Sequence, residues 1–103
     1  MNIEMTEVPQ QLFEPGMIVN ITCQTDSANP PSVIVWTIDS QIITSGPEYM
    51  IITHEQKSSF NANLTISQLS FVARFHHSKH VFECSILGQS RLKQHVSFCV
   101  IGK

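Results

Sequence analysis

The chain has 103 residues, close to the size of one domain, and only 14% of them are charged, with a formal net charge of −2. This composition excludes the basic surface that nucleic-acid binding needs, and no apolar run approaches the roughly 20 residues of a membrane span. The residues after Met1 are acidic and polar, so they do not have the pattern of a signal peptide. We therefore expect no nucleic-acid partner, a natural chain that continues on one or both sides, and membrane attachment only through a segment outside this chain.

Alternating apolar and polar side chains predict β-strands along most of the chain, and no segment has convincing helical periodicity. Turns that contain proline or glycine separate the strands. We predict eight strands, over residues 3–12, 17–24, 33–38, 41–44, 48–54, 60–67, 80–87 and 93–101. Short strands in this number, with frequent turns, are typical of a two-sheet sandwich.

The second and sixth predicted strands each carry an N-glycosylation sequon, Asn-Ile-Thr from Asn20 and Asn-Leu-Thr from Asn63. In the second strand, Ile21 and Cys23 should face inward, which leaves Asn20 exposed on the other side. In the sixth, Ala62 and Leu64 should face inward and leave Asn63 exposed. We predict glycosylation at these two positions, with at least one of them occupied in a eukaryotic host.

Cys23 and Cys84, with Trp36 between them at the end of the third predicted strand, form the strongest pattern in the sequence. In an immunoglobulin sandwich, two such cysteines face each other across the sheets and the tryptophan packs on their bridge. Closing so long a loop stabilises a domain by roughly 4 kcal/mol in the chain-entropy model. We therefore predict an all-β, immunoglobulin-like two-sheet Greek-key sandwich with an inter-sheet disulfide.

The residues around this pattern resemble the immunoglobulin superfamily of adhesion receptors. The Ile-Thr-Cys segment that ends at Cys23 and the Asn-Pro-Pro-Ser-Val-Ile-Val-Trp segment that ends at Trp36 look like the B–C region, and residues 63–84 look like the E strand, the E–F crossing and the F strand. The sequence is most similar to membrane-proximal, second-type domains of nectins, nectin-like molecules, nephrin relatives and the insect Beaten path and Sidestep receptors. The resemblance covers nearly the whole chain. It implies that residues 1–103 are a single immunoglobulin-like domain, a fragment of a longer extracellular chain.

Two features depart from variable-type domains. Phe82 stands where those domains carry a tyrosine, so the tyrosine-corner hydrogen bond cannot form and the E–F corner must be held otherwise. The short distance from Trp36 to Cys84 leaves little room for extra C′ and C″ strands. The resemblance therefore implies a constant-like or C2/I-type sandwich, with Trp36 and Phe82 in its core.

Cys99 is the third cysteine of the chain. Val96, Phe98 and Val100 alternate and should face inward, so Cys99 should point outward. An unpaired cysteine in an exported protein suggests intermolecular pairing, whereas a partly covered thiol would be inert. Both alternatives stay open at this point, and a slip of one residue in register would place Cys99 in the core.

The sequence does not indicate metal binding or catalysis. His76, His77 and His80 form a cluster, but no carboxylate or cysteine lies at convincing ligand spacing, so we interpret the cluster as a solvated loop and predict no metal site. A pH response is chemically available because histidine titrates near pH 6.5. The chain has no nucleophile motif and no glycine-rich phosphate loop, so we expect no catalytic residues, no cofactor and no small-molecule substrate.

The resemblance implies an extracellular recognition or spacer domain of a cell-surface adhesion or immune-type receptor, which acts by protein–protein binding with another cell-surface or secreted protein or with itself. The two sequons and a disulfide pair favour an oxidising, exported setting. The alternative is a secreted or structural immunoglobulin module that dimerises through Cys99.

Glycans on the sheet that holds both sequons would leave the opposite sheet as the freer face for a partner. That sheet would contain residues 33–38, 80–87 and 93–101. Ile42, Ile43 and Arg91 are candidate contact residues on or near it.

Overall fold

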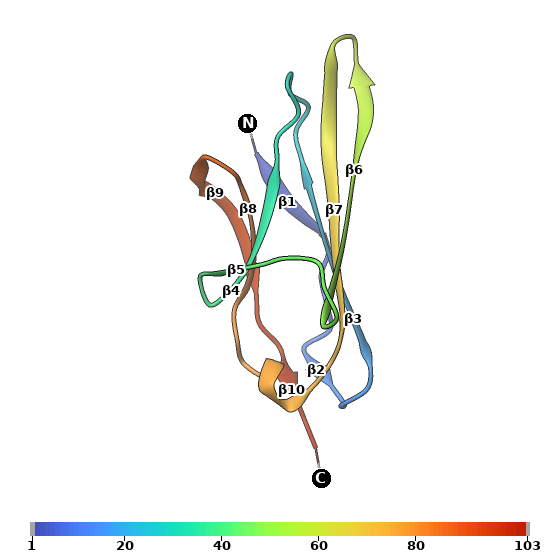
Figure 1. The fold of residues 1–103 in the computed structure, drawn as a ribbon, viewed down its shortest axis with the longest axis vertical. Helices are drawn as coiled ribbons and strands as arrows, with labels where there is room; N and C mark the ends of the chain where they lie inside the picture. The colour runs from blue at the N-terminus through green and yellow to red at the C-terminus, as the bar shows by residue number, and fades with distance from the viewer. Residues whose placement is uncertain (1, 103) are drawn as a thin grey trace.

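The computed structural model describes residues 2–102 as a sandwich of two antiparallel four-stranded sheets (Figure 1). The strands are β1 Ile3–Glu7, β2 Leu12–Phe13, β3 Ile18–Thr25, β4 Ile34–Ile38, β5 Gln41–Ile43, β6 Tyr49–Ser59, β7 Ala62–Val72, β8 Phe82–Ile86, β9 Gln89–Val96 and β10 Cys99–Val100. The first sheet has the order β1-β3-β7-β6 and the second β5-β4-β8-β9, while β2 and β10 form a short parallel pair. This order corresponds to strands A, B, E and D opposite strands C′, C, F and G of an immunoglobulin sandwich.

The core lies between the two sheets, where β3 and β8 bring Cys23 and Cys84 together. Their sulfur atoms are bonded at 2.01 Å, and both residues are completely buried. Trp36 is directly opposite Cys84 in the register of β4 and β8, and its indole N–H donates to Ser67 Oγ at 2.8 Å. This hydrogen bond satisfies the one polar group of a buried indole. The predicted all-β immunoglobulin-like sandwich with an inter-sheet disulfide is confirmed.

Three phenylalanines from separate segments stack in the core. Phe82 packs nearly parallel to Phe71, with ring centroids 5.0 Å apart, and to Phe98, with ring centroids 5.3 Å apart. Phe82 is fully buried. Its ring therefore contributes apolar contact on both faces without a hydroxyl group that would need a partner.

The first and last predicted strands are each divided in two. Residues 3–12 do not form one strand, because β1 pairs with β3 in the first sheet and β2 pairs with β10. Pro9 stands between β1 and β2, and proline has no N–H to donate to a sheet ladder. At the other end of the chain, Ser97 and Phe98 separate β9 from β10.

The sixth predicted strand has its faces reversed. In β7 the buried residues are Thr65, Ser67, Leu69 and Phe71, whereas Leu64 is only half-buried. A shift of one position along a strand moves every side chain to the opposite face. Here the pairing of β7 with β3 determines which face is buried, because buried Cys23 pairs opposite Ser67. The inward hydroxyls are satisfied, because Thr65 donates to the Ser32 carbonyl and Ser67 accepts from the indole of Trp36.

Strands β5 and β6 also differ from expectation. β5 pairs with β4 as a C′-type strand, so the chain does have room for that strand, and no further strand follows it in this sheet among residues 2–102. β6 is longer than predicted and pairs with β7 over nearly its whole length. The β6–β7 hairpin extends beyond the rest of the sandwich at the upper end of Figure 1.

Candidate functional site at the E–F corner

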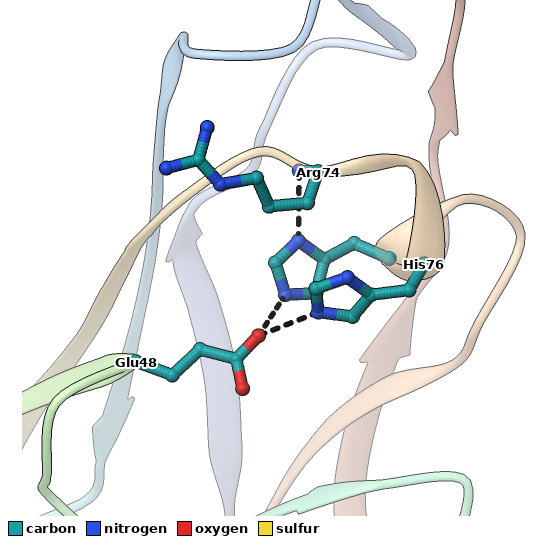
Figure 2. Close-up of polar contacts among 4 residues, drawn as sticks. Glu48, Arg74 and His76 are labelled. Carbon is teal, nitrogen blue, oxygen red and sulfur yellow. Dashed lines mark hydrogen bonds and ion pairs between the residues drawn. The ribbon is translucent and has the colours of Figure 1, made fainter.

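The E–F corner, residues 73–81, joins β7 to β8 and contains one turn of 3-10 helix, η1 Phe75–His77. His77 is only 2% exposed. Its Nδ1 accepts a hydrogen bond from the backbone N–H of Arg74 at 3.0 Å, and its Nε2 lies 2.9 Å from Glu48 Oε2 (Figure 2). Nε2 of His76 lies 2.6 Å from the same carboxylate oxygen. Two histidines of the corner thus meet one carboxylate from the loop before β6.

These contacts determine where the proton of His77 lies. The Arg74 N–H points at Nδ1, so Nδ1 must present its lone pair, and the proton of the neutral ring is on Nε2. An ionised carboxylate can only accept hydrogen bonds, so His77 Nε2–H donates to Glu48. His77 therefore links the backbone of the corner to the segment that begins β6.

The charges of the cluster follow from burial and these hydrogen bonds. Burial lowers the pKa of His77, although Glu48 acts in the opposite direction. The hydrogen bond from His76 lowers the pKa of Glu48. Burial, together with the neighbouring charge of Glu48, raises the pKa of Tyr49 to about 12. At neutral pH the site consists of a charged Glu48 and a neutral His77.

Aromatic rings surround His77. Its ring centroid lies 4.6 Å from that of Phe71, 5.9 Å from that of Tyr49 and 6.2 Å from that of Phe82. The interpretation of the histidine cluster as a solvated loop was therefore wrong for His77, which packs against the core. Sequence reasoning also missed Glu48, because no spacing rule relates it to residues that lie nearly thirty positions later.

The third histidine joins the corner to the second sheet. His80 Nδ1 contacts Asp39 Oδ2, and Asp39 Oδ1 accepts from the Val81 N–H at 2.8 Å. The hydrogen bond from Val81, then that from His80, lowers the pKa of Asp39. A shallow cleft of about 380 Å³ lies between these contacts, and its lining residues are Ile38, Asp39, Gln41, Ile42, Ile43, Tyr49, His76, His77 and His80.

The cluster has the donor types of a zinc site, but its hydrogen bonds do not suit a metal. Glu48, His76 and His77 each place a ligand atom within 4.8 Å of the others. A histidine that binds a metal normally donates its other N–H to an acceptor, whereas Nδ1 of His77 accepts from Arg74. Nε2 of His77 would have to lose its proton to bind a cation. The arrangement therefore works as a hydrogen-bonded link within the fold.

The remaining predicted site residues lie elsewhere in the sandwich. Asn20 on β3 and Asn63 on β7 were predicted to be exposed, and both are instead half-buried. For Asn63 the reason is the reversed alternation of β7, which places it on the same side of the strand as Thr65 and Ser67. Asn20 and Asn63 lie on the first sheet, outside the histidine cluster.

Cys99 is half-buried on β10 and is the free cysteine of the chain. Cys99 lies beside the E–F corner, because its neighbour Phe98 accepts from the Lys79 N–H at 2.7 Å and its neighbour Val100 donates to Ser78 Oγ at 2.9 Å.

The predicted contact residues differ in exposure. Ile42 is 71% exposed, whereas Ile43 is half-buried and packs against the core. Arg91 is exposed on β9. Of the three predicted contact residues, Ile42 and Arg91 are therefore open to a partner.

Similarity to a solved structure supports the fold. Comparisons with family models and with curated proteins found no match to the chain. A solved structure described as "Crystal Structure of Rst D1-D2" is similar, with a TM-score of 0.75 and 16% sequence identity over 99% of this chain and 48% of that chain. The chain thus spans about half the length of that chain. The similarity supports an immunoglobulin-like domain and does not extend to the nectin or nephrin families. No helix among residues 2–102 is long and apolar enough to cross a membrane.

Proposed function

We propose that this chain is one extracellular immunoglobulin-like domain of a longer cell-surface adhesion or immune-type receptor, and that it acts by protein–protein recognition or as a spacer. The observation that carries this proposal is the buried Cys23–Cys84 disulfide at the centre of an immunoglobulin sandwich. Disulfides of this kind persist in oxidising compartments and are rare in the cytosol. Many cell-surface domains share this sandwich architecture, which supports the proposal.

The outer face of the second sheet is the surface we assign to a partner. The register places Ile42, Thr37 and Glu83 in one row across β5, β4 and β8, with His95 of β9 at its end. Glu83 Oε1 also lies 3.8 Å from Lys93 Nζ. Thr37 is buried in this row, so Ile42 is its exposed apolar side chain, with the charged and polar groups of Glu83 and His95 further along the row. An apolar contact beside polar groups fits a small recognition patch.

Substitution at Ile42 tests this face. The domain, displayed in several copies on a bead, would be assayed for binding to a panel of extracellular domains that includes the domain itself. We expect Ile42→Lys to abolish binding and Val8→Lys, a control at a similarly exposed apolar residue on the link between β1 and β2, to retain it. Binding that survives Ile42→Lys would contradict the assigned face. A wild-type domain that binds no member of the panel would favour the spacer role.

The alternative function is a secreted or structural module that dimerises through Cys99. The half-exposed, unpaired thiol on β10 favours it. Non-reducing electrophoresis of the oxidised domain distinguishes the two functions. A covalent dimer that Cys99→Ser abolishes would support the alternative, whereas a monomer with a free thiol would support the receptor domain.

A further inference from the structure

The outer face of the first sheet carries an exposed apolar group, which we call the outer patch: Ile18, Met50, Ile52 and Val72. The first three side chains are 59%, 58% and 54% exposed. Ile18 of β3 pairs opposite Val72 of β7, and Met50 and Ile52 lie along β6 on the other side of β7. A contiguous apolar area on a folded domain usually marks a surface that is covered in the working protein.

The sequon at Asn20 lies on the same face as this patch, next to Ile18 along β3. Asn20 pairs opposite Ser70, which pairs opposite Met50, so the three side chains form one row on the same face. Adjacent strands are about 4.8 Å apart, which places the backbone of Asn20 on the order of 10 Å from that of Met50. Thr22 lies on the same face because side chains alternate along a strand, and the next row continues from Thr22 to Ile52 through Gln68.

The amide of Asn20 is oriented by one contact. Ser70 Oγ donates to Asn20 Oδ1 at 2.7 Å. This bond uses the oxygen of the amide, and no hydrogen bond among residues 2–102 engages its Nδ2, the atom that would bear a sugar. The acceptor nitrogen is therefore available on an open sheet face.

The second sequon has a different environment. The backbone of Asn63 pairs in both directions with Ala28, at 3.1 and 2.9 Å. Its Nδ2 donates to Glu55 Oε1 at 3.4 Å. Asn63 also lines a hollow of about 330 Å³ together with Ala28, Pro31 and Lys57. The acceptor nitrogen of Asn63 therefore already has a partner, unlike that of Asn20.

We infer that Asn20 carries an N-linked glycan that lies over the outer patch, and that this sheet is covered by sugar rather than by a protein. The inference rests on the proposed extracellular function. A lipid-linked oligosaccharide diphosphate supplies the sugar. The Asn20 nitrogen forms a bond to C1 of the first sugar, the bond from C1 to the diphosphate oxygen breaks, and the nitrogen loses one proton without oxidation or reduction. The attached glycan is bulky and hydrophilic, and so keeps the patch soluble.

Site mapping tests the position of the glycan. The domain, preceded by a secretion signal, would be expressed in insect or mammalian cells as wild type, Asn20→Gln and Asn63→Gln, and glycopeptides would be mapped by mass spectrometry. We expect Asn20→Gln to lose the mass of one glycan and Asn63→Gln to keep it. A secreted, disulfide-bonded domain with unmodified Asn20 would overturn the inference and leave the proposed function intact. Failure of secretion would count instead against the extracellular function, and occupancy of Asn20 would then be determined in the intracellular pool.

Dye binding tests whether the glycan covers the patch. We expect enzymatic removal of the glycan to increase the fluorescence of an apolar dye, and the double variant Met50→Ser, Ile52→Thr to remove that increase. Leu87→Ser is the matched control, because Leu87 is an exposed apolar residue on the β8–β9 turn, outside the patch. Fluorescence that does not change on deglycosylation, or that rises equally in the patch variant, would overturn coverage of the patch.

Discussion

The backbone N–H of Arg74 donates to Nδ1 of His77, and this hydrogen bond fixes the proton of a buried imidazole on Nε2, where it reaches Glu48. Many immunoglobulin domains hold the same corner with a tyrosine hydroxyl that bonds back to the chain. Phe82 occupies the position of that tyrosine and has no hydroxyl. His77 provides a polar connection in the same region, from a different place in the sequence.

Replacement of His77 should weaken the fold. His77→Phe keeps a ring in the core but leaves the Arg74 N–H without its acceptor and removes the link to Glu48. We expect a loss of about 1–3 kcal/mol in the free energy of unfolding, measured by urea denaturation. His76→Gln is the control, since His76 is exposed and its contact with Glu48 should contribute less than about 1 kcal/mol. Equal losses in the two variants would show that burial of His77 adds nothing to stability.

The stability of the domain should fall in mild acid. Burial holds the pKa of His77 in the folded domain below the ordinary value of 6.5 that the unfolded chain retains. Between these two pKa values the unfolded chain binds more protons, so the free energy of unfolding decreases as the pH drops below 6.5 and levels off below the folded pKa. Three other titratable groups act on the ring of His77. Glu48 raises its pKa, whereas the neighbouring His76 and His80 lower it.

A second loss should follow at lower pH. The pKa of Glu48 is below its ordinary value of 4.5, so the stability from its hydrogen bonds is present above that pH and is lost as Glu48 becomes protonated. Urea denaturation at several pH values would measure both losses. The variant His77→Phe should lack the first of these losses. If its free energy of unfolding fell as steeply as that of the wild type between pH 6.5 and the folded pKa of His77, the assignment to His77 would be contradicted.

Zinc should not stabilise the domain. Nε2 of His77 carries a proton in the tautomer that Arg74 imposes, so the three-residue cluster lacks a ready third ligand. We expect thermal unfolding with added zinc chloride to give the same melting temperature as unfolding with a chelator. A rise in melting temperature that disappears in Glu48→Gln would show that the cluster binds metal.

The disulfide should contribute more than any other single bond. Replacement of both Cys23 and Cys84 by alanine should cost about 2–5 kcal/mol, with the fluorescence of the adjacent Trp36 as the probe of unfolding. Cys99→Ser, a substitution of the half-exposed free thiol, is the control and should leave stability nearly unchanged. A comparable loss for Cys99→Ser would mean that this cysteine packs in the core.

The sequence by itself determined the fold class. Cys23, Trp36 and Cys84 could be read as a framework because their positions along the strands are imposed by a disulfide between two sheets. The orientation of Phe98 and Val100 toward the core, with Cys99 between them less buried, also follows from simple alternation. These features depend on local periodicity and on one long-range pairing with a recognisable pattern.

Only the tertiary structure decided which face of β7 is buried and what holds the E–F corner. Both faces of β7 carry apolar residues, and alternation alone predicted that the face of Leu64 is buried. The pairing of Cys23 with Ser67 buries the opposite face instead. Glu48 and His77 meet because the sandwich folds the start of β6 against the corner. No local rule encodes that contact, because side chains far apart in sequence become neighbours only when the sheets have packed.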